Sequence, residues 1–162
     1  MREPAGEQAG TLRALSGRLE MVERVADCIF CAIVAGEAPV QKVYEDVRLV
    51  AFMDAFPVAE GHLLLVPKRH GKDLFETDVE DLRALIAVSK DMAEAIRSEL
   101  APEGIFVCQL NGAAAGQTVF HYHMHLIPRN TGDRVRPGSQ HGRVPGDPEA
   151  LARVAARLAA AL

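Results

Sequence analysis

The sequence predicts a single globular domain that mixes β-strands with helices. Its 162 residues are enough to bury one hydrophobic core. A hydrophobic fraction of 49% with 25% charged residues is typical of a soluble globular protein. Short runs of β-forming residues occur along the chain together with two longer stretches of helical apolar spacing. We therefore expect one domain without internal repeats.

Charge and cysteine content narrow the classes of function. The formal net charge is −4, so the chain lacks the polybasic character of a protein that binds duplex nucleic acid. No apolar run approaches the roughly 18 residues of a membrane span, and residues 1–10 contain no hydrophobic signal core. Two of the three cysteines lie three positions apart, which favours metal or redox use over a disulfide framework. We expect a cytoplasmic protein with neither duplex nucleic acid nor a membrane as partner.

We divide the chain into an N-terminal extension at 1–26, a domain at 27–130, and a C-terminal loop and helix at 131–162. Residues 1–10 are small and polar with Pro and Gly, which indicates disorder. From Thr11 to Val25, loosely spaced apolar residues favour a short exposed helix. Met21 is an alternative start of the chain.

Strands are predicted where β-forming residues are bounded by turn signals. Two are expected at Val43–Asp46 and Arg48–Asp54, around a tight acidic turn. The continuous apolar run His62–Pro67 predicts a central strand. Another is expected at 105–110, before a loop of small residues.

Two helices are predicted from apolar spacing and end signals. Thr77 and Glu80 form a capping box, and the helix that they begin is expected to run to Leu100, before Pro102. Asp147 and Pro148 form an N-cap and first-turn pair for the last helix.

The most informative stretch is 116–129, where three histidines alternate with large apolar residues. This period of two predicts a strand with His121, His123 and His125 on one face, about 6.6 Å between successive ones. Three imidazoles are costly to bury because each brings two polar nitrogens that need partners. The pattern therefore favours chemistry over a purely structural role.

Phosphorus chemistry is the first possibility for these histidines. A free imidazole, with a pKa of about 6.5, is largely neutral near pH 7, so one ring nitrogen can attack phosphorus and form a covalent intermediate. His125 can stabilise charge or protonate the leaving group, and Gln117 and Thr118 can donate hydrogen bonds to phosphate oxygens. Asp54, which ends an apolar strand, is either the polar rim of a pocket or an ordinary turn residue.

Metal binding is the second possibility. Cys28 and Cys31 with His70 and one triad histidine would make a Cys₂His₂ set for a closed, structural zinc site. A catalytic metal held by all three triad histidines is less favoured, because residues on one face of a strand have their bases spread along it.

These residues resemble the histidine-triad (HIT) family. The segment 121–127 has the triad pattern, in which histidine and an apolar residue alternate three times before one more apolar residue, and the resemblance extends from about Cys28 to Arg129. Matching positions outside the triad are Phe30, Tyr44-Glu45-Asp46, Ala51-Phe52, Asp54, Gly61-His62, Val66-Pro67-Lys68, His70, Asn111 and Gly116-Gln117-Thr118. The chain is most similar to the bacterial branch near the nucleoside phosphoramidases (Hint-like proteins), while Pro128-Arg129 also resembles dinucleoside-polyphosphate hydrolases.

The resemblance implies an α+β fold, with an antiparallel sheet of about five strands and packed helices, and a homodimer. It also implies that His123 attacks the α-phosphate to give a nucleotidyl-histidine that water then hydrolyses. His125 and His62 would support this step, with Gln117 and Thr118 near the phosphate and the leaving group.

The resemblance further implies a purine nucleotide or nucleotidyl conjugate as ligand. Asp54 would take the ribose hydroxyls and Asn111 a phosphate-side contact. The base pocket would be walled by Phe30, Ile33 and Phe52. One structural zinc per chain, and no organic cofactor, would be held by Cys28, Cys31, His70 and His121.

Three departures from the family pattern bear on substrate choice. Thr118 replaces a serine, Ala55 replaces a larger aliphatic residue, and the tail lacks a tryptophan. The sequence thus predicts cleavage of adenylyl or guanylyl phosphoramidates or of dinucleoside polyphosphates. The alternative is a zinc-stabilised nucleotide-binding adaptor with little catalytic activity, and a small zinc-knuckle nucleic-acid binder is disfavoured by the acidic balance.

Overall fold

The structure, a computed structural model, describes residues 25–134 and 143–162. Its strands form one antiparallel sheet of five, in the order β1-β2-β3-β5-β4. They are β1 (Lys42–Glu45), β2 (Leu49–Met53), β3 (Leu63–Pro67), β4 (Gly104–Cys108) and β5 (Met124–Arg129). The helices are α1 (Ile29–Val34), α2 (Val79–Leu100) and α3 (Pro148–Ala160), with a 3₁₀ turn, η1, at Ala113–Ala115. The expected α+β fold is confirmed, and β3 is the central strand, as predicted.

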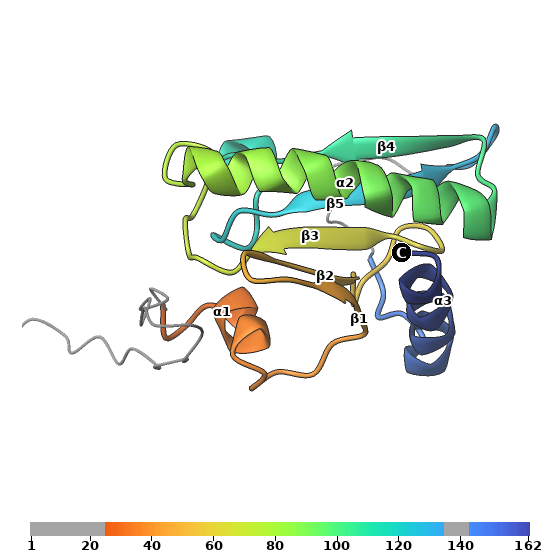
Figure 1. The fold of residues 1–162 in the computed structure, drawn as a ribbon. Coiled ribbons are helices and arrows are strands. Elements are labelled where there is room, and N and C mark those ends of the chain that lie inside the picture. Colours follow the sequence, from red (N-terminus) through yellow and green to blue (C-terminus); the bar gives the residue numbers. More distant parts are fainter. Residues whose placement is uncertain (1–24, 135–142) are drawn as a thin grey trace, which may run out of the picture.

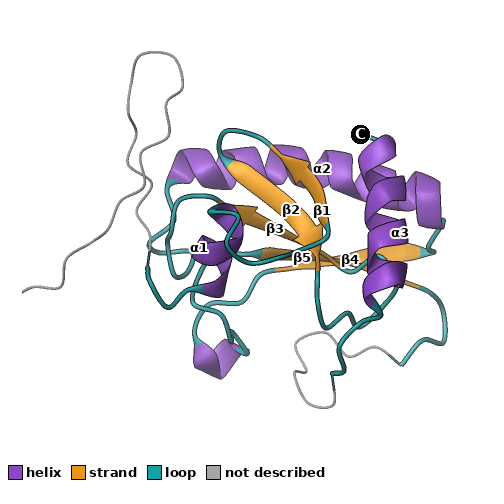
Figure 2. Ribbon diagram, turned by 90° about the horizontal axis from the view of Figure 1, so that it is seen from below, coloured by secondary structure: helices purple, strands orange, loops and turns teal. Residues whose placement is uncertain are grey.

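The helices cover the two faces of the sheet unequally. The long helix α2 lies along one face, and α1 lies on the other side (Figures 1 and 2). On the α2 face, alternate strand residues pack against α2 and α3, and this core contains Val43, Leu49, Ala51, Met53, Leu63, Leu65, Leu85, Met92, Ala95, Ile96, Tyr122, Met124, Leu126, Val154, Ala155 and Leu158. The smaller core on the α1 face contains Phe30, Ile33, Val50, Phe52, Leu64 and Val66.

Two of the predicted turns and caps have the expected chemistry. Asp46 Oδ1 accepts hydrogen bonds from the backbone N–H groups of Arg48 (2.7 Å) and Leu49 (2.6 Å), which closes the acidic turn between β1 and β2. Asp147 caps α3 by accepting from Ala150 N at 3.0 Å, with proline in the first turn. Both sites use a short carboxylate to satisfy free backbone donors.

The predicted capping box at the start of α2 is wrong by one residue. Asp78 is the N-cap, and its Oδ1 accepts from Glu80 N at 2.8 Å. Thr77 lies one residue before the cap, in the preceding turn, where its hydroxyl donates to the Asp73 carbonyl at 2.7 Å. The helix therefore begins at Val79 and ends at Leu100, before Ala101 in the left-handed conformation.

The predicted strand over 116–129 is also corrected, because only Met124–Arg129 is a strand. The β5 ladder with β3 begins at the pair Leu65–Met124. Upstream, Tyr122 N donates instead to the carbonyl of Gly71, at 2.7 Å. His121 and His123 therefore precede the strand, and the expected row of three histidines on one strand face does not form.

The N-terminal predictions mostly lie outside the described residues. The expected helix from Thr11 and the alternative start at Met21 belong to residues 1–24, which are not described. Within 25–134 and 143–162, no helix is both long enough and apolar enough to cross a membrane.

Candidate active site and metal centre

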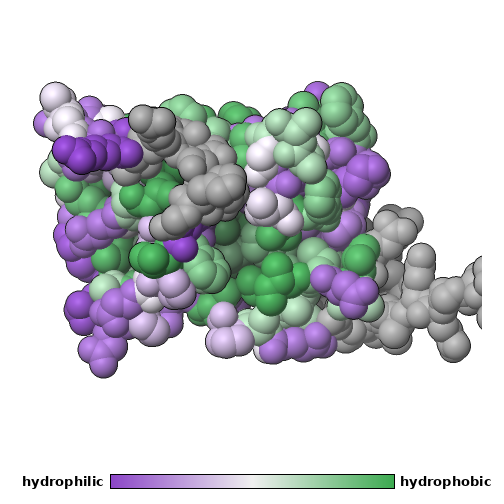
Figure 3. Space-filling view, turned by 180° about the vertical axis from the view of Figure 1, so that it is seen from behind, coloured by the Kyte–Doolittle hydropathy of each residue, from purple (hydrophilic) through white to green (hydrophobic). Residues whose placement is uncertain are grey.

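Five histidines of the described chain form two neighbouring clusters on the sheet face opposite α2. His125 is paired with Leu64 across β5 and β3, which places its side chain on the α1 face. Figure 3 shows this side of the molecule, where apolar side chains gather around a hollow. One cluster contains His70 and His121 and the other contains His62, His123 and His125.

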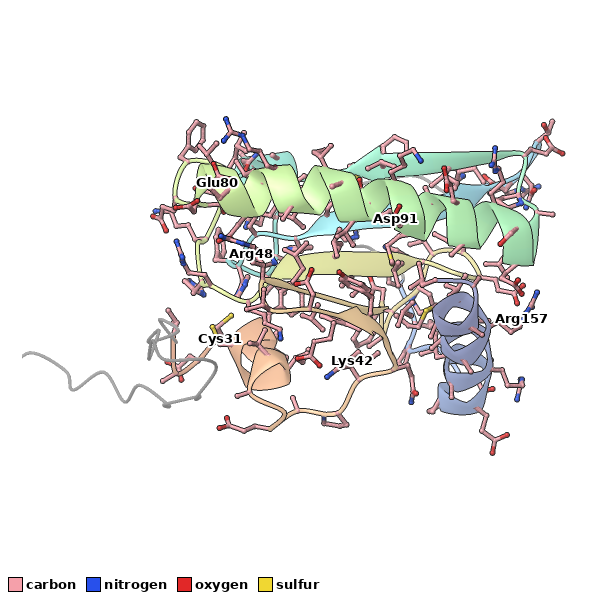
Figure 4. The ribbon with its side chains drawn as sticks, in the orientation of Figure 1. Cys31, Lys42, Arg48, Glu80, Asp91 and Arg157 are labelled. Carbon is pink, nitrogen blue, oxygen red and sulfur yellow. The ribbon has the colours of Figure 1, made fainter. Side chains whose placement is uncertain are left out.

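The first cluster brings together the four predicted zinc ligands. His121 Nδ1 lies 3.4 Å from Cys28 Sγ, 3.7 Å from Cys31 Sγ and 3.2 Å from His70 Nδ1. Cys31 Sγ lies 3.4 Å from His70 Nδ1. Cys31 comes from α1 and lies at the end of the molecule away from α3 (Figure 4).

These separations fit a tetrahedral zinc ion. Zinc with Zn–N of about 2.05 Å and Zn–S of about 2.3 Å holds two nitrogens about 3.3 Å apart and a nitrogen and a sulfur about 3.6 Å apart. The observed 3.2 Å for the His70–His121 pair and 3.4–3.7 Å for the nitrogen–sulfur pairs agree with this geometry.

The protonation of His121 also suits a metal ligand. Its Nε2 lies 2.8 Å from the Pro67 carbonyl, and a carbonyl can only accept, so Nε2 carries the proton. Nδ1 is then left with a lone pair facing the thiols, as a zinc ligand requires. Burial lowers the pKa of His121 to about 4, and the Pro67 carbonyl opposes this shift.

His123 has the opposite arrangement. Its Nδ1 lies 2.7 Å from the carbonyl of His121, so Nδ1 carries the proton and Nε2 keeps the lone pair. The Phe30 ring lies edge-on at 5.1 Å between centroids and fixes the imidazole from one side. Burial lowers the pKa of His123 below its usual 6.5. The result is a neutral imidazole with a defined nucleophilic nitrogen.

His62 and His125 form a directed hydrogen-bond chain. Val58 N–H donates to His62 Nδ1 at 3.2 Å, so the proton of neutral His62 is on Nε2. Nε2–H then donates to His125 Nδ1 at 2.9 Å, which leaves His125 with its proton on Nε2. Gly61 permits this loop geometry, because it has φ +82° and a Cβ there would lie 2.3 Å from Leu100 Cδ1.

Both imidazoles of this chain are held neutral by burial. Burial lowers the pKa of His62 to about 4, which the Asp54 carboxylate partly opposes and Arg143 reinforces. Burial lowers the pKa of His125 to about 3, and the neighbouring His123, His62 and Arg143 add to the shift. Near pH 7 the hydrogen bonds from Val58 through His62 to His125 therefore form a donor relay that ends at the N–H on His125 Nε2. The rings of His125 and His123 lie side by side, with their centroids 4.9 Å apart.

Asp54 lies at the edge of this cluster and is buried. Its Oδ1 accepts from Phe56 N at 2.8 Å, and its Oδ2 accepts from Arg143 Nη2 at 2.5 Å. Oδ2 is also 3.4 Å from His62 Nε2. The bond to Phe56 N is the turn contact that the sequence allowed, and the role of Asp54 as a rim acceptor for a ligand stays a prediction.

Asp54, His62 and His125 could in principle hold a second metal ion, since one ligand atom of each lies within 4.8 Å of the others. The hydrogen bonds oppose this use. Because Val58 N–H occupies His62 Nδ1, the nitrogen that faces Asp54 and His125 is protonated and has no lone pair for a metal. The arrangement is that of a hydrogen-bond relay.

The residues predicted to line a base pocket also lie together. Phe30 and Phe52 pack edge to face with centroids 5.6 Å apart, and Ile33 belongs to the same buried cluster. These apolar side chains adjoin His123 through Phe30. They offer a flat ligand an apolar wall next to the His123 imidazole.

The predicted phosphate-side residues have internal partners. Gln117 Oε1 accepts from Gly112 N at 2.7 Å, and its Nε2 donates to the carbonyls of Lys72 (2.5 Å) and Val119 (3.0 Å). Asn111 Oδ1 accepts from Leu74 N at 2.8 Å. Both amides thus tie the loop that contains η1 to neighbouring segments, while Thr118 is exposed.

Sequence reasoning missed the groups that set these protonation states. The carbonyls of Pro67 and His121 and the N–H of Val58 belong to the backbone, which residue types do not reveal. Arg143 was missed because it lies within a stretch rich in Gly, Pro and charge, without a recognisable motif. The match of Gly61-His62 to the family pattern was the one available signal for the relay.

Comparison with known proteins matches this site to one family. The family model described as the HIT domain matches residues 35–132. A Zn-bound histidine triad family protein from Mycobacterium smegmatis is 37% identical, covers 83% of this chain and 92% of its own, and has a TM-score of 0.73. A hypothetical histidine triad nucleotide-binding protein from Sulfolobus tokodaii is 31% identical over 83% of this chain and 91% of its own, with a TM-score of 0.74. The adenylylsulfatase HINT3 of Arabidopsis thaliana is 37% identical over 117 residues, which are 72% of this chain and 59% of that protein.

Proposed function

This chain belongs to the HIT family, and we propose that it is a nucleotidyl hydrolase or transferase that works through a nucleotidyl-histidine on His123. The single observation that carries this proposal is the hydrogen bond from His123 Nδ1–H to the His121 carbonyl. It leaves Nε2 unprotonated in a buried, neutral imidazole, as a nucleophile requires. The adenylylsulfatase activity named for the Arabidopsis relative is of the same general kind.

In the first step, His123 Nε2 attacks the α-phosphorus of a nucleotidyl substrate. The new N–P bond forms as the bond from phosphorus to the leaving group breaks, and the leaving group departs with the bonding pair and takes up a proton. Water then attacks the same phosphorus, the N–P bond breaks, and the nucleoside monophosphate is released. Phosphoramidates and dinucleoside polyphosphates with an adenylyl or guanylyl group are the substrates that we propose.

The relay from Val58 supports both steps. It presents His125 Nε2–H as a donor whose direction is set before substrate arrives. A fixed donor beside a phosphoryl oxygen stabilises the negative charge that develops there without reorganisation. In this proposal Thr118 adds a hydroxyl on the phosphate side, and Gln117 and Asn111 position the loop of that side through their internal bonds.

We propose that the nucleotide lies across the α1 face of the sheet. A purine would stack within the apolar wall of Phe30, Ile33 and Phe52, and the ribose hydroxyls would donate to Asp54. The functional domain would be 27–130, with 1–26 as an N-terminal extension and 131–162 as a C-terminal loop and helix whose α3 packs onto it.

We propose one structural zinc per chain at Cys28, Cys31, His70 and His121. Four protein ligands would close the coordination sphere, so the bound ion would supply cross-linking and no open coordination position. The ligands come from α1, from the loop after β3 and from the segment before β5, and holding them together would fix the carbonyl of His121 that orients His123. A site with two thiol ligands needs a reducing compartment, which supports a cytoplasmic location.

A homodimer is proposed through the β4 edge of the sheet. β4 has a partner only on its β5 side within the described residues, and its Phe106 and Val107 are exposed. Nearby apolar side chains on an unpaired strand edge favour pairing with another copy of the strand.

The experiment that tests the proposal is turnover of an adenylyl phosphoramidate by wild type and His123→Ala. We expect the substitution to reduce kcat by at least about a thousandfold, because it removes the nitrogen that would form the N–P bond. His123→Gly with added imidazole should recover part of the rate. Arg83→Ala, on the exposed face of α2, is the control and should leave kcat unchanged.

Two outcomes would decide against this mechanism. Full activity of folded His123→Ala would exclude His123 as the nucleophile. Wild-type protein that binds AMP but turns over no nucleotidyl substrate would favour the zinc-stabilised adaptor instead.

A further inference from the structure

Arg143 reaches into the cluster of His62, His123 and His125, which we call the catalytic cluster after its proposed role. It does so from outside the part of the chain that matches the family model, which ends at residue 132. Its Nη2 donates to Asp54 Oδ2 at 2.5 Å, and its Nε donates to the Phe56 carbonyl at 2.7 Å. Gly146 N donates to the Ala55 carbonyl at 2.9 Å. The chain at 143–146 is therefore bonded to three successive residues of the loop that contains Asp54.

The Arg143–Asp54 pair is largely shielded from water. The side chains are 13% and 10% exposed, respectively. In such surroundings the loss of one partner leaves a buried charge without compensation, which is costly. The pair should therefore persist when a ligand enters.

Arg143 affects both the position and the charge of Asp54. Phe56 N–H holds Oδ1 and the guanidinium holds Oδ2, so the carboxylate is fixed from both ends. The negative charge would otherwise lie 3.4 Å from His62 Nε2, next to the histidines that face the phosphate. A bare anion at this position would repel a negatively charged ligand, and the guanidinium cancels that charge.

We propose that Arg143 is a substrate-positioning residue, which fixes and neutralises Asp54 so that the site accepts the phosphate of an anionic nucleotide. This inference rests on the proposed function, since it assumes that a nucleotide occupies the α1 face. It assigns a role in nucleotide affinity to the C-terminal segment, beyond the packing of α3.

The test is calorimetric binding of AMP and of adenosine to the zinc-loaded full chain. Arg143→Met should weaken AMP binding by about tenfold or more, and adenosine binding clearly less, because adenosine lacks the phosphate charge. With the phosphoramidate substrate, KM should rise more than kcat falls. Arg143→Lys, which keeps the charge, should recover part of the affinity. Arg153→Met, on the exposed side of α3, is the matched control and should bind AMP as wild type does.

A double-mutant cycle with Asp54→Asn tests whether Arg143 acts through Asp54. The loss caused by Arg143→Met should be much smaller in the Asp54→Asn background, where no carboxylate needs neutralising. An equal loss in both backgrounds would overturn the inference, as would unchanged AMP affinity in Arg143→Met or equal losses for AMP and adenosine. Folded wild type that binds no AMP would instead refute the proposed function itself.

Discussion

His121 and His123 are two residues apart, and the structure gives them opposite protonation patterns. The Pro67 carbonyl takes the Nε2 proton of His121 and leaves Nδ1 open toward the cysteine thiols. The His121 carbonyl takes the Nδ1 proton of His123 and leaves Nε2 open beside His125. The difference teaches that a backbone acceptor, rather than the position of a histidine in the motif, decides which ring nitrogen keeps its lone pair.

The two clusters of side chains also differ in their net charge. The metal cluster, which is Cys28, Cys31, His70 and His121, contains two thiols and two imidazoles. A divalent cation would neutralise the charge of its two thiolates. The catalytic cluster contains neutral imidazoles and one Asp54–Arg143 ion pair, so it has no net charge of its own. The first cluster suits a resident cation and the second a transient anion.

The largest effect should come from breaking the metal cluster alone. Cys31→Ser should lose the zinc and destabilise the fold by about 3 kcal/mol or more, because metal binding is coupled to folding at such sites. Metal analysis and denaturant unfolding would measure this. Cys108→Ser is a matched control, since that thiol lies on β4 outside the metal cluster. A Cys31→Ser protein with one zinc per chain and unchanged stability would refute the assigned ligand set.

Sequence reasoning reached the composition of both clusters because their residue types are distinctive. The Cys28–Cys31 spacing, His70 and the triad identify possible ligands without coordinates, and the apolar run of β3 identifies the central strand. Sequence reasoning could not give the relative positions of these groups in space. The alternation of histidine with apolar residues predicts that His121, His123 and His125 lie on one strand, whereas only His125 is in β5.

The remaining errors have a common physical cause. The segment before β5 satisfies its backbone by bonding to the loop after β3, as in Tyr122 N to Gly71 O, and no local propensity encodes such a contact. Asp78 takes the N-cap position by accepting from Glu80 N, while Thr77 belongs to the preceding turn through its bond to Asp73. Arg143 acts 89 residues away from Asp54 in sequence. In each case a contact that the pattern does not encode decides the outcome, distant in sequence for Tyr122 and Arg143 and four residues away for Thr77.

A smaller effect should come from interrupting the relay in the catalytic cluster. The two nitrogens of the His62 ring accept from Val58 N and donate to His125 at the same time. A glutamine side chain lacks this ring spacing, so in His62→Gln the imidazole of His125 loses its fixed orientation. We expect kcat for an adenylyl phosphoramidate to fall by about 10- to 100-fold, with zinc content unchanged. His70→Gln gives the converse comparison, because it should lose zinc. A His62→Gln protein with wild-type kcat would show that the relay does not contribute to turnover.

The effect that is smallest at neutral pH, where it is not yet expressed, is the acid dependence of stability that the relay imposes. Burial lowers the pKa of His62 to about 4 and that of His125 to about 3. As pH falls below about 6.5 the unfolded chain takes up protons that the folded chain does not bind, so stability is present above pH 6.5 and is lost toward pH 4. Each histidine should contribute a slope approaching about 1.4 kcal/mol per pH unit within that window.

Removing one of these histidines isolates the contribution of the relay. Between pH 6 and 4.5, the unfolding free energy of His62→Gln should fall less steeply than that of wild type, by up to about 1.4 kcal/mol per pH unit. Denaturant unfolding at several pH values would measure both slopes, and equal slopes would mean that His62 is not held neutral by burial. Because acid protonates the same four metal ligands in both proteins, zinc release cancels in the comparison, and the difference reports the catalytic cluster alone.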